Sequence, residues 1–509
     1  MYSNKKIKSV LSDLEPKNVF YFFEEICRIP HGSGNTKAIS DYLRDFAIER
    51  SLDYYQDDLN NVIIYKNMDC DDEGIIDNKS YFNDEPIILQ GHMDMVCEKS
   101  IESSKNMEID ALDLVVDGDF ISADGTSLGA DNGIAIAMML AILDDDELDL
   151  PSIEAVFTAD EEIGLIGAEG LDLSNLSGRA LINLDSELEG YLVVSCAGGN
   201  RLDVRIPLDY YDLDDRLIGD DYSLIEVFID GLRGGHSGIE INKGLANANK
   251  IIAEMLAILN DSVDIKLINI EGGNADNAIP TEAKCAFLAK VDEVKDIVEE
   301  YGLRVNREVF DLEEDFSLEF RASEISKWDV LSSGVLSDET RDNVIGFLNA
   351  VPNGVCKMSD DISGLVETSL NLGVMELDYD FNATISVRSA FDSERDKLND
   401  DIVAIAEEFN GIVDVRGDYP SWEYDEDSKL RDLICRVYEE EYGKPMVVEI
   451  IHAGLECGLF VNKIDGLDAV SMGPTLRDVH SFNERMSISS VYRTYNLLIK
   501  ILKEFKYNK

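Results

Sequence analysis

Residues that can bind metal ions follow several apolar runs that have the length of β-strands. The runs lie at residues 87–91, 155–159, 181–184 and 469–473, and the residues that follow them are His92, Asp94, Glu161, Glu162, Asp185 and His480. Loops at the carboxyl ends of strands in an open α/β sheet converge on one crevice, so we predict that these side chains share a site. Asp131 precedes an apolar helical run at residues 133–143. The N–H groups of a helix N-terminus favour a carboxylate there, which adds Asp131 to the predicted site.

Imidazole and carboxylate together are the ligand set of zinc, cobalt and manganese, whereas magnesium and calcium prefer oxygen alone. The set is too large for one tetrahedral ion and suits two metal ions that share a bridging carboxylate. The predicted ligands are His92, Asp131, Glu162, Asp185 and His480. Glu161 would then remain free as a base, and Asp94 would accept the second N–H of His92.

Each of these positions also has an ordinary structural explanation. A lone histidine in a loop is more often a surface or hydrogen-bonded residue than a metal ligand, and Asp185 after a strand would also suit a turn. Adjacent acids such as Glu161 and Glu162 are common in so acidic a chain. The repeated placement of ligand types directly after strands favours the shared site.

The elements that must position these residues alternate between short apolar runs and helical ones up to about residue 200, and again after Pro420. That alternation is typical of an α/β domain built on a mixed sheet. The middle section instead has hairpin-like polar turns between its apolar runs. We therefore predict one domain formed by residues 1–198 and 421–509, interrupted by an inserted block at residues 199–420.

The composition excludes several classes of protein. The chain of 509 residues has 45 lysines and arginines against 103 aspartates and glutamates, and its net charge of -58 repels nucleic acid and anionic membrane surfaces. The longest apolar run is about half of what a membrane span requires. The eight cysteines form no CxxC pair, and the first residues contain no apolar leader, which fits free thiols in a cytoplasmic protein.

Motifs along nearly the whole chain resemble the M20 metallopeptidases, and within them the bacterial aminoacyl-histidine dipeptidases. In chain order they are GHMDMV, SLGADNGIAIA, ADEEIGLIGAEGL, NLDSE, GLRGGHSGIEI, VETSLNLG, SVRS, HAGLECG and GPTLRDVHSFNERM. The resemblance implies a zinc-peptidase-like mixed-sheet catalytic domain interrupted by an α+β lid and dimerisation domain. It also implies a homodimer that hydrolyses dipeptides, Xaa-His and others, with two divalent ions: zinc first, or cobalt or manganese.

The resemblance assigns roles to residues. Asp131 would bridge the two ions. His92 and Asp185 would be the other ligands of one ion, and Glu162 and His480 those of the second. The peptide bond after Asp131 would be cis. Glu161 resembles the general base and Asp94 the residue that orients His92. In the middle block, His236 resembles a residue that stabilises the oxyanion or substrate. The predicted substrate-binding residues are Asn277, Arg388 and Glu456, whereas His452 and the segment 300–350 have no assigned role.

Other functions fit parts of the same sequence. Gly125, Ser127 and Gly129 match the GxSxG elbow of serine hydrolases, although that assignment leaves the histidines and carboxylates without a task. A non-catalytic binding protein would be expected to lack Glu161 or a ligand, and neither is missing. An M20 tripeptidase or N-acyl amino acid deacylase would share the metals and differ in the walls of its pocket.

Overall fold

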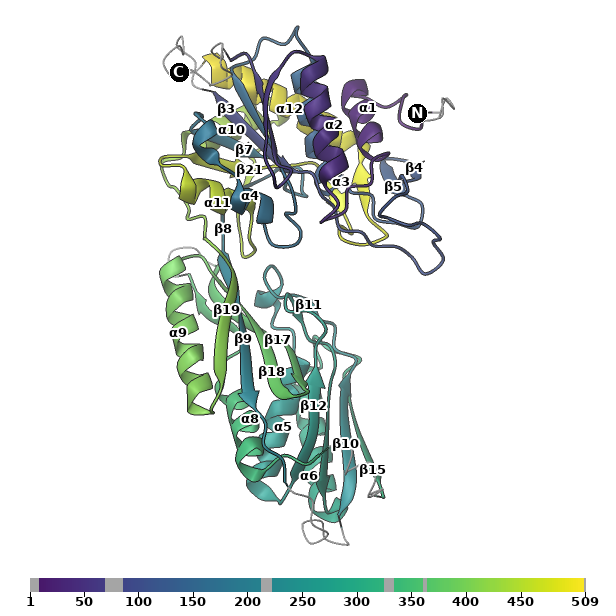
Figure 1. Cartoon of the computed structure of the whole chain (residues 1–509), viewed down its shortest axis with the longest axis vertical. Helices are drawn as coiled ribbons and strands as arrows, with labels where there is room; N and C mark the ends of the chain where they lie inside the picture. The colour runs from purple at the N-terminus through teal and green to yellow at the C-terminus, as the bar shows by residue number, and fades with distance from the viewer. Residues whose placement is uncertain (1–8, 69–85, 212–221, 325–333, 360–363, 508–509) are drawn as a thin grey trace. The chain divides into compact units, whose positions relative to one another are not determined.

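The computed structural model describes residues 9–68, 86–211, 222–324, 334–359 and 364–507 (Figure 1). The chain forms two compact units. The first consists of Met1–Ser195, Tyr424–Ile450 and Leu455–Lys509, and the second of Cys196–Glu423 and Ile451–Gly454. The short return of the chain to the second unit at Ile451–Gly454 was not predicted.

The first unit is built on an eight-stranded mixed sheet with the order β1-β2-β6-β3-β7-β21-β8-β20. Its central strands β6, β3, β7 and β21 are mutually parallel, whereas β1 and β2 are antiparallel at one edge. The strands are β1 (Asp53–Gln56), β2 (Val62–Lys66), β3 (Ile87–His92), β6 (Ile153–Thr158), β7 (Ala180–Asn183), β8 (Tyr191–Cys196), β20 (Val447–Ile451) and β21 (Asp468–Ser471).

The helices of this unit are α1 (Lys17–Ile26), α2 (Lys37–Glu49), α3 (Ala130–Asp144), α4 (Ile166–Gly170), α10 (Lys429–Tyr442), α11 (Glu456–Lys463) and α12 (Ile488–Tyr507). The apolar run at residues 133–143 forms most of α3, and all of its residues are buried. Helix α3 packs against α1 and β3. A helix that is apolar on every side is expected inside a protein, and this placement fixes Asp131, near the start of α3, beside the sheet.

A second, four-stranded sheet in the same unit has the order β22-β23-β5-β4. Its strands are β4 (Leu114–Asp117), β5 (Phe120–Ala123), β22 (Leu476–Arg477) and β23 (Arg485–Ser487). β22 and β23 pair as an antiparallel hairpin, and β23 also pairs with β5. The loop of this hairpin, residues 478–484, carries His480.

The second unit is an antiparallel nine-stranded sheet with the order β15-β10-β14-β12-β17-β18-β9-β19, in which β16 also pairs with β17. The strands are β9 (Gly198–Pro207), β10 (Ser223–Asp230), β12 (Lys266–Gly272), β14 (Ala283–Ala289), β15 (Ser317–Ser323), β16 (Gly354–Met358), β17 (Val366–Leu377), β18 (Asp380–Ser389) and β19 (Ile412–Tyr419). A separate two-stranded ribbon joins β11 (Gly235–His236) to β13 (Ala278–Ile279).

Four helices share an apolar core with this sheet: α5 (Ala248–Ser262), α6 (Val291–Val309), α8 (Asp338–Ala350) and α9 (Asp392–Glu408). The segment 300–350, which matched no motif, supplies the end of α6, strand β15 and all of α8, with residues 325–333 outside the described part. The predicted fold class, a mixed-sheet α/β domain interrupted by an α+β block, is confirmed.

No helix in the described part of the chain is long and apolar enough to cross a membrane. The seven cysteines in that part are free thiols, as predicted. The eighth, Cys70, lies outside the described residues.

Candidate metal centre

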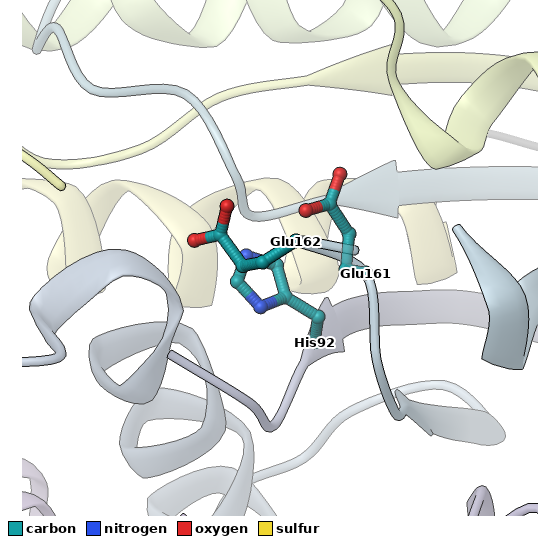
Figure 2. A group of neighbouring side chains, drawn as sticks. All are labelled: His92, Glu161 and Glu162. Atoms are coloured by element: carbon teal, nitrogen blue, oxygen red, sulfur yellow. The ribbon is translucent and has the colours of Figure 1, made fainter. Parts of the chain in front are cut away.

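Three parallel strands deliver most of the predicted ligands to one end of the first sheet. β3 ends at His92, β6 is followed by Glu161 and Glu162, and β7 by Asp185. These strands are adjacent in the order β6-β3-β7, so their carboxyl ends lie together. Figure 2 shows His92, Glu161 and Glu162 gathered beyond the end of β3.

Asp131 lies between the two histidines. Its Oδ1 is 3.3 Å from His92 Nε2 and its Oδ2 is 3.1 Å from His480 Nε2. Each histidine also has a second carboxylate: Asp185 Oδ1 lies 3.3 Å from His92 Nε2, and Glu162 Oε1 lies 3.0 Å from His480 Nε2. Asp131 therefore belongs to two groups of three ligands, whose donor atoms lie within 4.8 Å of one another in each group. This is the arrangement expected of a bridging carboxylate.

The charges of the site match a pair of cations. Burial would raise the pKa of Asp131, but hydrogen bonds with His480 and His92 outweigh it and lower the pKa below its ordinary value. The neighbouring carboxylates of Asp131 and Glu162 raise the pKa of His480 to about 11. Burial raises the pKa of Asp185 to about 7. Neighbouring carboxylates repel one another when they are all ionised, and divalent ions bound among them would neutralise that charge.

Two buried oxygens point to the same conclusion. Glu162 Oε1 and Asp185 Oδ1 accept no hydrogen bond of good geometry from any described residue. Buried polar atoms are usually satisfied, and one that is not calls for an explanation such as an ion. The residues present therefore fit a two-metal centre.

Asp94 contacts His92 and the backbone of the two glutamates that follow β6. The backbone carbonyl of Asp94 lies 3.0 Å from His92 Nδ1, whereas its carboxylate Oδ1 is 3.6 Å from that nitrogen. The carboxylate accepts the backbone N–H of Glu161 at 3.0 Å and of Glu162 at 3.3 Å, and the Ser33 hydroxyl at 2.8 Å. Donation from Nδ1 to the carbonyl leaves Nε2 of His92 unprotonated, as a metal ligand requires.

Glu161, the predicted base, forms a further group of possible ligands with His92 and Glu162. Burial raises its pKa well above the ordinary value; the charges of Asp185, Glu162 and Glu456 raise it further, and His92 opposes them. No described residue donates a hydrogen bond to its carboxylate. A carboxylate with a raised pKa accepts a proton more readily than an ordinary glutamate does.

A buried polar network lies beside these ligands and was not predicted as a network. Glu456, at the start of α11, is fully buried and accepts hydrogen bonds from Gln90 and from the Thr158 hydroxyl at 2.8 Å. Gln90 also accepts a hydrogen bond from Asn183 at 2.6 Å. A glutamine within the apolar run of β3 was the available signal, because a polar residue in a strand that is buried on both faces needs partners.

The second unit positions its own predicted residues. His236 pairs with Ala278 across the ribbon of β11 and β13, and the Ser237 N–H donates to the Asn277 carbonyl at 2.8 Å. His236 Nδ1 accepts the backbone N–H groups of Gly238 at 3.0 Å and of Ile239 at 3.2 Å. A neutral imidazole that accepts at Nδ1 carries its proton at Nε2, so His236 presents Nε2–H as a donor.

Arg388 lies on β18 and is largely buried. Its Nη1 donates to the Tyr419 hydroxyl at 2.7 Å, while its Nε is buried without a hydrogen-bond partner among the described residues. His452 Nε2 lies 2.7 Å from the Ser369 hydroxyl. Burial, with smaller contributions from the charges of Arg388 and His236, lowers the pKa of His452 to about 3. His452 is therefore a neutral residue of the second unit.

The GxSxG match has a structural explanation. The Ser127 hydroxyl is buried, donates to the Val96 carbonyl at 2.7 Å and accepts the Glu98 N–H at 3.1 Å. Gly129 adopts φ of 66°, a left-handed conformation that glycine reaches without a Cβ penalty. The motif thus shapes the turn before α3. The peptide bond between Asp131 and Asn132 is cis, as predicted.

Comparison with known proteins places the chain in a family. Residues 88–504 match the sequence profile of peptidase family M20/M25/M40. The chain belongs to this family. The predicted M20 metallopeptidase is therefore confirmed, and the two groups of ligands around Asp131 are the candidate metal site of an M20 peptidase.

The similarity to known proteins covers nearly the whole chain. The chain is 35% identical over 500 residues to the cytosol non-specific dipeptidase of Escherichia coli (strain K12), across 97% of this chain and 99% of that protein. The crystal structure of aminoacylhistidine dipeptidase from Vibrio alginolyticus has a TM-score of 0.82 and 33% identity, covering 97% and 98% of the two chains. A tripeptidase from Staphylococcus aureus, with a TM-score of 0.54 and 15% identity over 97% and 99% of the chains, shares the fold.

Proposed function

We propose that this chain hydrolyses dipeptides, Xaa-His dipeptides among them, with two divalent ions held by His92, Asp131, Glu162, Asp185 and His480. The observation that carries the proposal is Asp131, whose two oxygens face two histidines, each with a second carboxylate. Full-length similarity to a cytosol non-specific dipeptidase and to an aminoacylhistidine dipeptidase supports the substrate class. Zinc suits the mixed imidazole and carboxylate ligands, as do cobalt and manganese.

When bound, the two ions would polarise the scissile carbonyl and lower the pKa of the attacking water. Glu161 accepts a proton from that water as the water oxygen bonds to the carbonyl carbon. The same carboxylic acid then donates the proton to the amide nitrogen as the carbon–nitrogen bond breaks, which releases two amino acids. The raised pKa of Glu161 strengthens its carboxylate as the acceptor of the water's proton.

The residues of the second unit are proposed to recognise the substrate. The Nε2–H of His236 would donate to the oxyanion of the tetrahedral intermediate, for which its tautomer is suited. Arg388, with its unsatisfied Nε, would bind the free carboxylate of the dipeptide beside Asn277. A receptor for that carboxylate at a fixed distance from the scissile bond would reject longer peptides. A substrate contact by Glu456 stays a prediction.

The substrate class is tested with the metal-loaded enzyme on a panel of Xaa-His dipeptides, other dipeptides, tripeptides and N-acyl amino acids. We expect kcat/KM to be highest for dipeptides with a free carboxylate, and to fall when that carboxylate is amidated. A preference for tripeptides or N-acyl amino acids would replace the proposal with the corresponding M20 activity.

We further propose a cytoplasmic homodimer formed through the second unit, with no nucleic-acid or membrane partner. The similar Escherichia coli protein is named a cytosol dipeptidase, which supports the location. Exposed apolar side chains at the end of α6 support the dimer: Leu303 is 66% exposed and Phe310 57%. Light scattering after size exclusion should give twice the mass of one chain, and Phe310→Glu should lower it.

A further inference from the structure

We propose that Glu484 is a positioning residue that holds the segments bearing Asp131 and His480 in place before any ion binds. Glu484 touches neither substrate nor metal in this role; it acts through the backbone of the segment 128–131. The inference rests on the proposed two-metal centre, because it concerns the geometry of two ligands of that centre. None of the motif assignments gave Glu484 a task.

The Glu484 carboxylate accepts four consecutive backbone N–H groups. Oε2 accepts those of Leu128 at 2.7 Å and Gly129 at 2.9 Å, and Oε1 accepts those of Ala130 at 2.8 Å and Asp131 at 3.2 Å. The side chain is 2% exposed. Each carboxylate oxygen therefore accepts two hydrogen bonds from the backbone at the start of α3.

These four donors would otherwise lack acceptors. The first N–H groups of a helix have no partner within the helix, and here Gly129 is left-handed and Asp131 departs from helical geometry. An anion at this position is favoured by the helix dipole and by the convergent N–H groups. A buried carboxylate held by four donors fixes the backbone at Asp131, and with it the direction of the bridging side chain.

The same carboxylate also fixes the other ligand segment. Glu484 ends the loop 478–484 of the hairpin β22/β23 and directly precedes β23, which pairs with β5. Its own N–H donates to the Ser481 carbonyl at 3.1 Å, so the residues after His480 form a tight turn. One side chain thus joins the loop of His480 to the segment of Asp131, two ligands that are 349 positions apart.

A purely structural carboxylate offers a matched control in the same unit. Glu154, at the start of β6, is fully buried and accepts the N–H groups of Ser177 at 2.9 Å and Gly178 at 3.0 Å. The metal ligands follow the opposite end of β6. Loss of the Glu154 charge should weaken the fold without changing the geometry at Asp131.

The experiment compares wild type, Glu484→Gln and Glu154→Gln as full-length chains stripped of metal. Glutamine keeps the size of glutamate but has one acceptor oxygen and a donor NH₂, so it can satisfy only one pair of the four N–H groups. Zinc and cobalt affinities are measured by competition with a chromophoric chelator, and the fold by circular dichroism. We expect Glu484→Gln to weaken at least one ion site by about 10- to 100-fold, and Glu154→Gln to bind both ions as wild type does.

The outcomes separate this inference from the proposed function. Wild type that fails to bind two ions overturns the metal centre itself, and the inference with it. Wild type that binds two ions, with Glu484→Gln equally tight or Glu154→Gln equally weakened, overturns the role of Glu484 alone. If Glu484→Gln does not fold, hydrogen exchange of metal-free wild type decides: the amides of 128–131 should be protected, and rapid exchange before metal addition overturns the inference.

Discussion

Replacing Glu161 and Glu162 separately by glutamine distinguishes proton transfer from metal binding at two adjacent positions. Glu161 accepts no hydrogen bond from a described residue, and burial disfavours its charge. Glutamine at this position leaves no described partner unsatisfied and removes a buried negative charge. We therefore expect Glu161→Gln to keep its metal and to unfold at the same or a higher temperature than wild type.

The catalytic loss should be large. A general base contributes about 10²- to 10⁴-fold to the rate, which corresponds to roughly 3 to 5 kcal/mol of transition-state stabilisation. Glu162→Gln should behave differently, because Glu162 Oε1 lies 3.0 Å from His480 Nε2 and belongs to a candidate ligand group. Its loss should lower metal occupancy first, with activity recovering in part at high metal concentration.

The assay measures kcat and KM on an Xaa-His dipeptide at saturating zinc, together with bound metal per chain after desalting. Glu161→Gln that keeps kcat within tenfold of wild type would refute the assignment of the base. A metal-depleted Glu161→Gln beside a metal-replete but inactive Glu162→Gln would show that the two roles are exchanged.

Three further predictions address the metal, the second unit and its buried histidine. Dialysis against a chelator should abolish dipeptide hydrolysis and zinc, cobalt or manganese should restore it; full activity in a verified metal-free sample would contradict the metal centre. His236→Ala should lower kcat by about 10²- to 10³-fold with both ions still bound, and normal turnover would exclude it from catalysis. His452 has a folded pKa of about 3, below the value near 6.5 of an unfolded histidine, so the unfolded chain takes up the proton first. Its contribution to stability is complete above about pH 6.5 and is lost as the pH falls toward 3, by up to roughly 5 kcal/mol. Chemical denaturation at pH 7 and pH 4.5 should show a smaller loss for His452→Gln than for wild type, and equal losses would mean that His452 is not buried as a neutral residue.

The residue types of the candidate site, their order along the chain and the class of fold could all be predicted from the sequence. Local patterns carry that information because a strand buried on both faces begins as an apolar run, as at residues 87–89 of β3, and the polar residues after the run lie at the end of the strand. The all-apolar run of α3 likewise predicted a buried helix, and the motifs around it predicted the family that the profile match confirmed.

Which atoms of these residues meet could be seen only in the folded chain. Asp94 contacts His92 most closely through its carbonyl because its carboxylate is occupied by backbone N–H groups, a choice that residue types cannot reveal. Glu484 and Asp131 are 353 positions apart, and Gln90 and Glu456 are 366 apart. Such pairs depend on the packing of complete elements, because no local pattern encodes the partner of a buried polar group. The return of Ile451–Gly454 to the second unit, which gives His452 its neutral, buried state, depends on the same long-range packing.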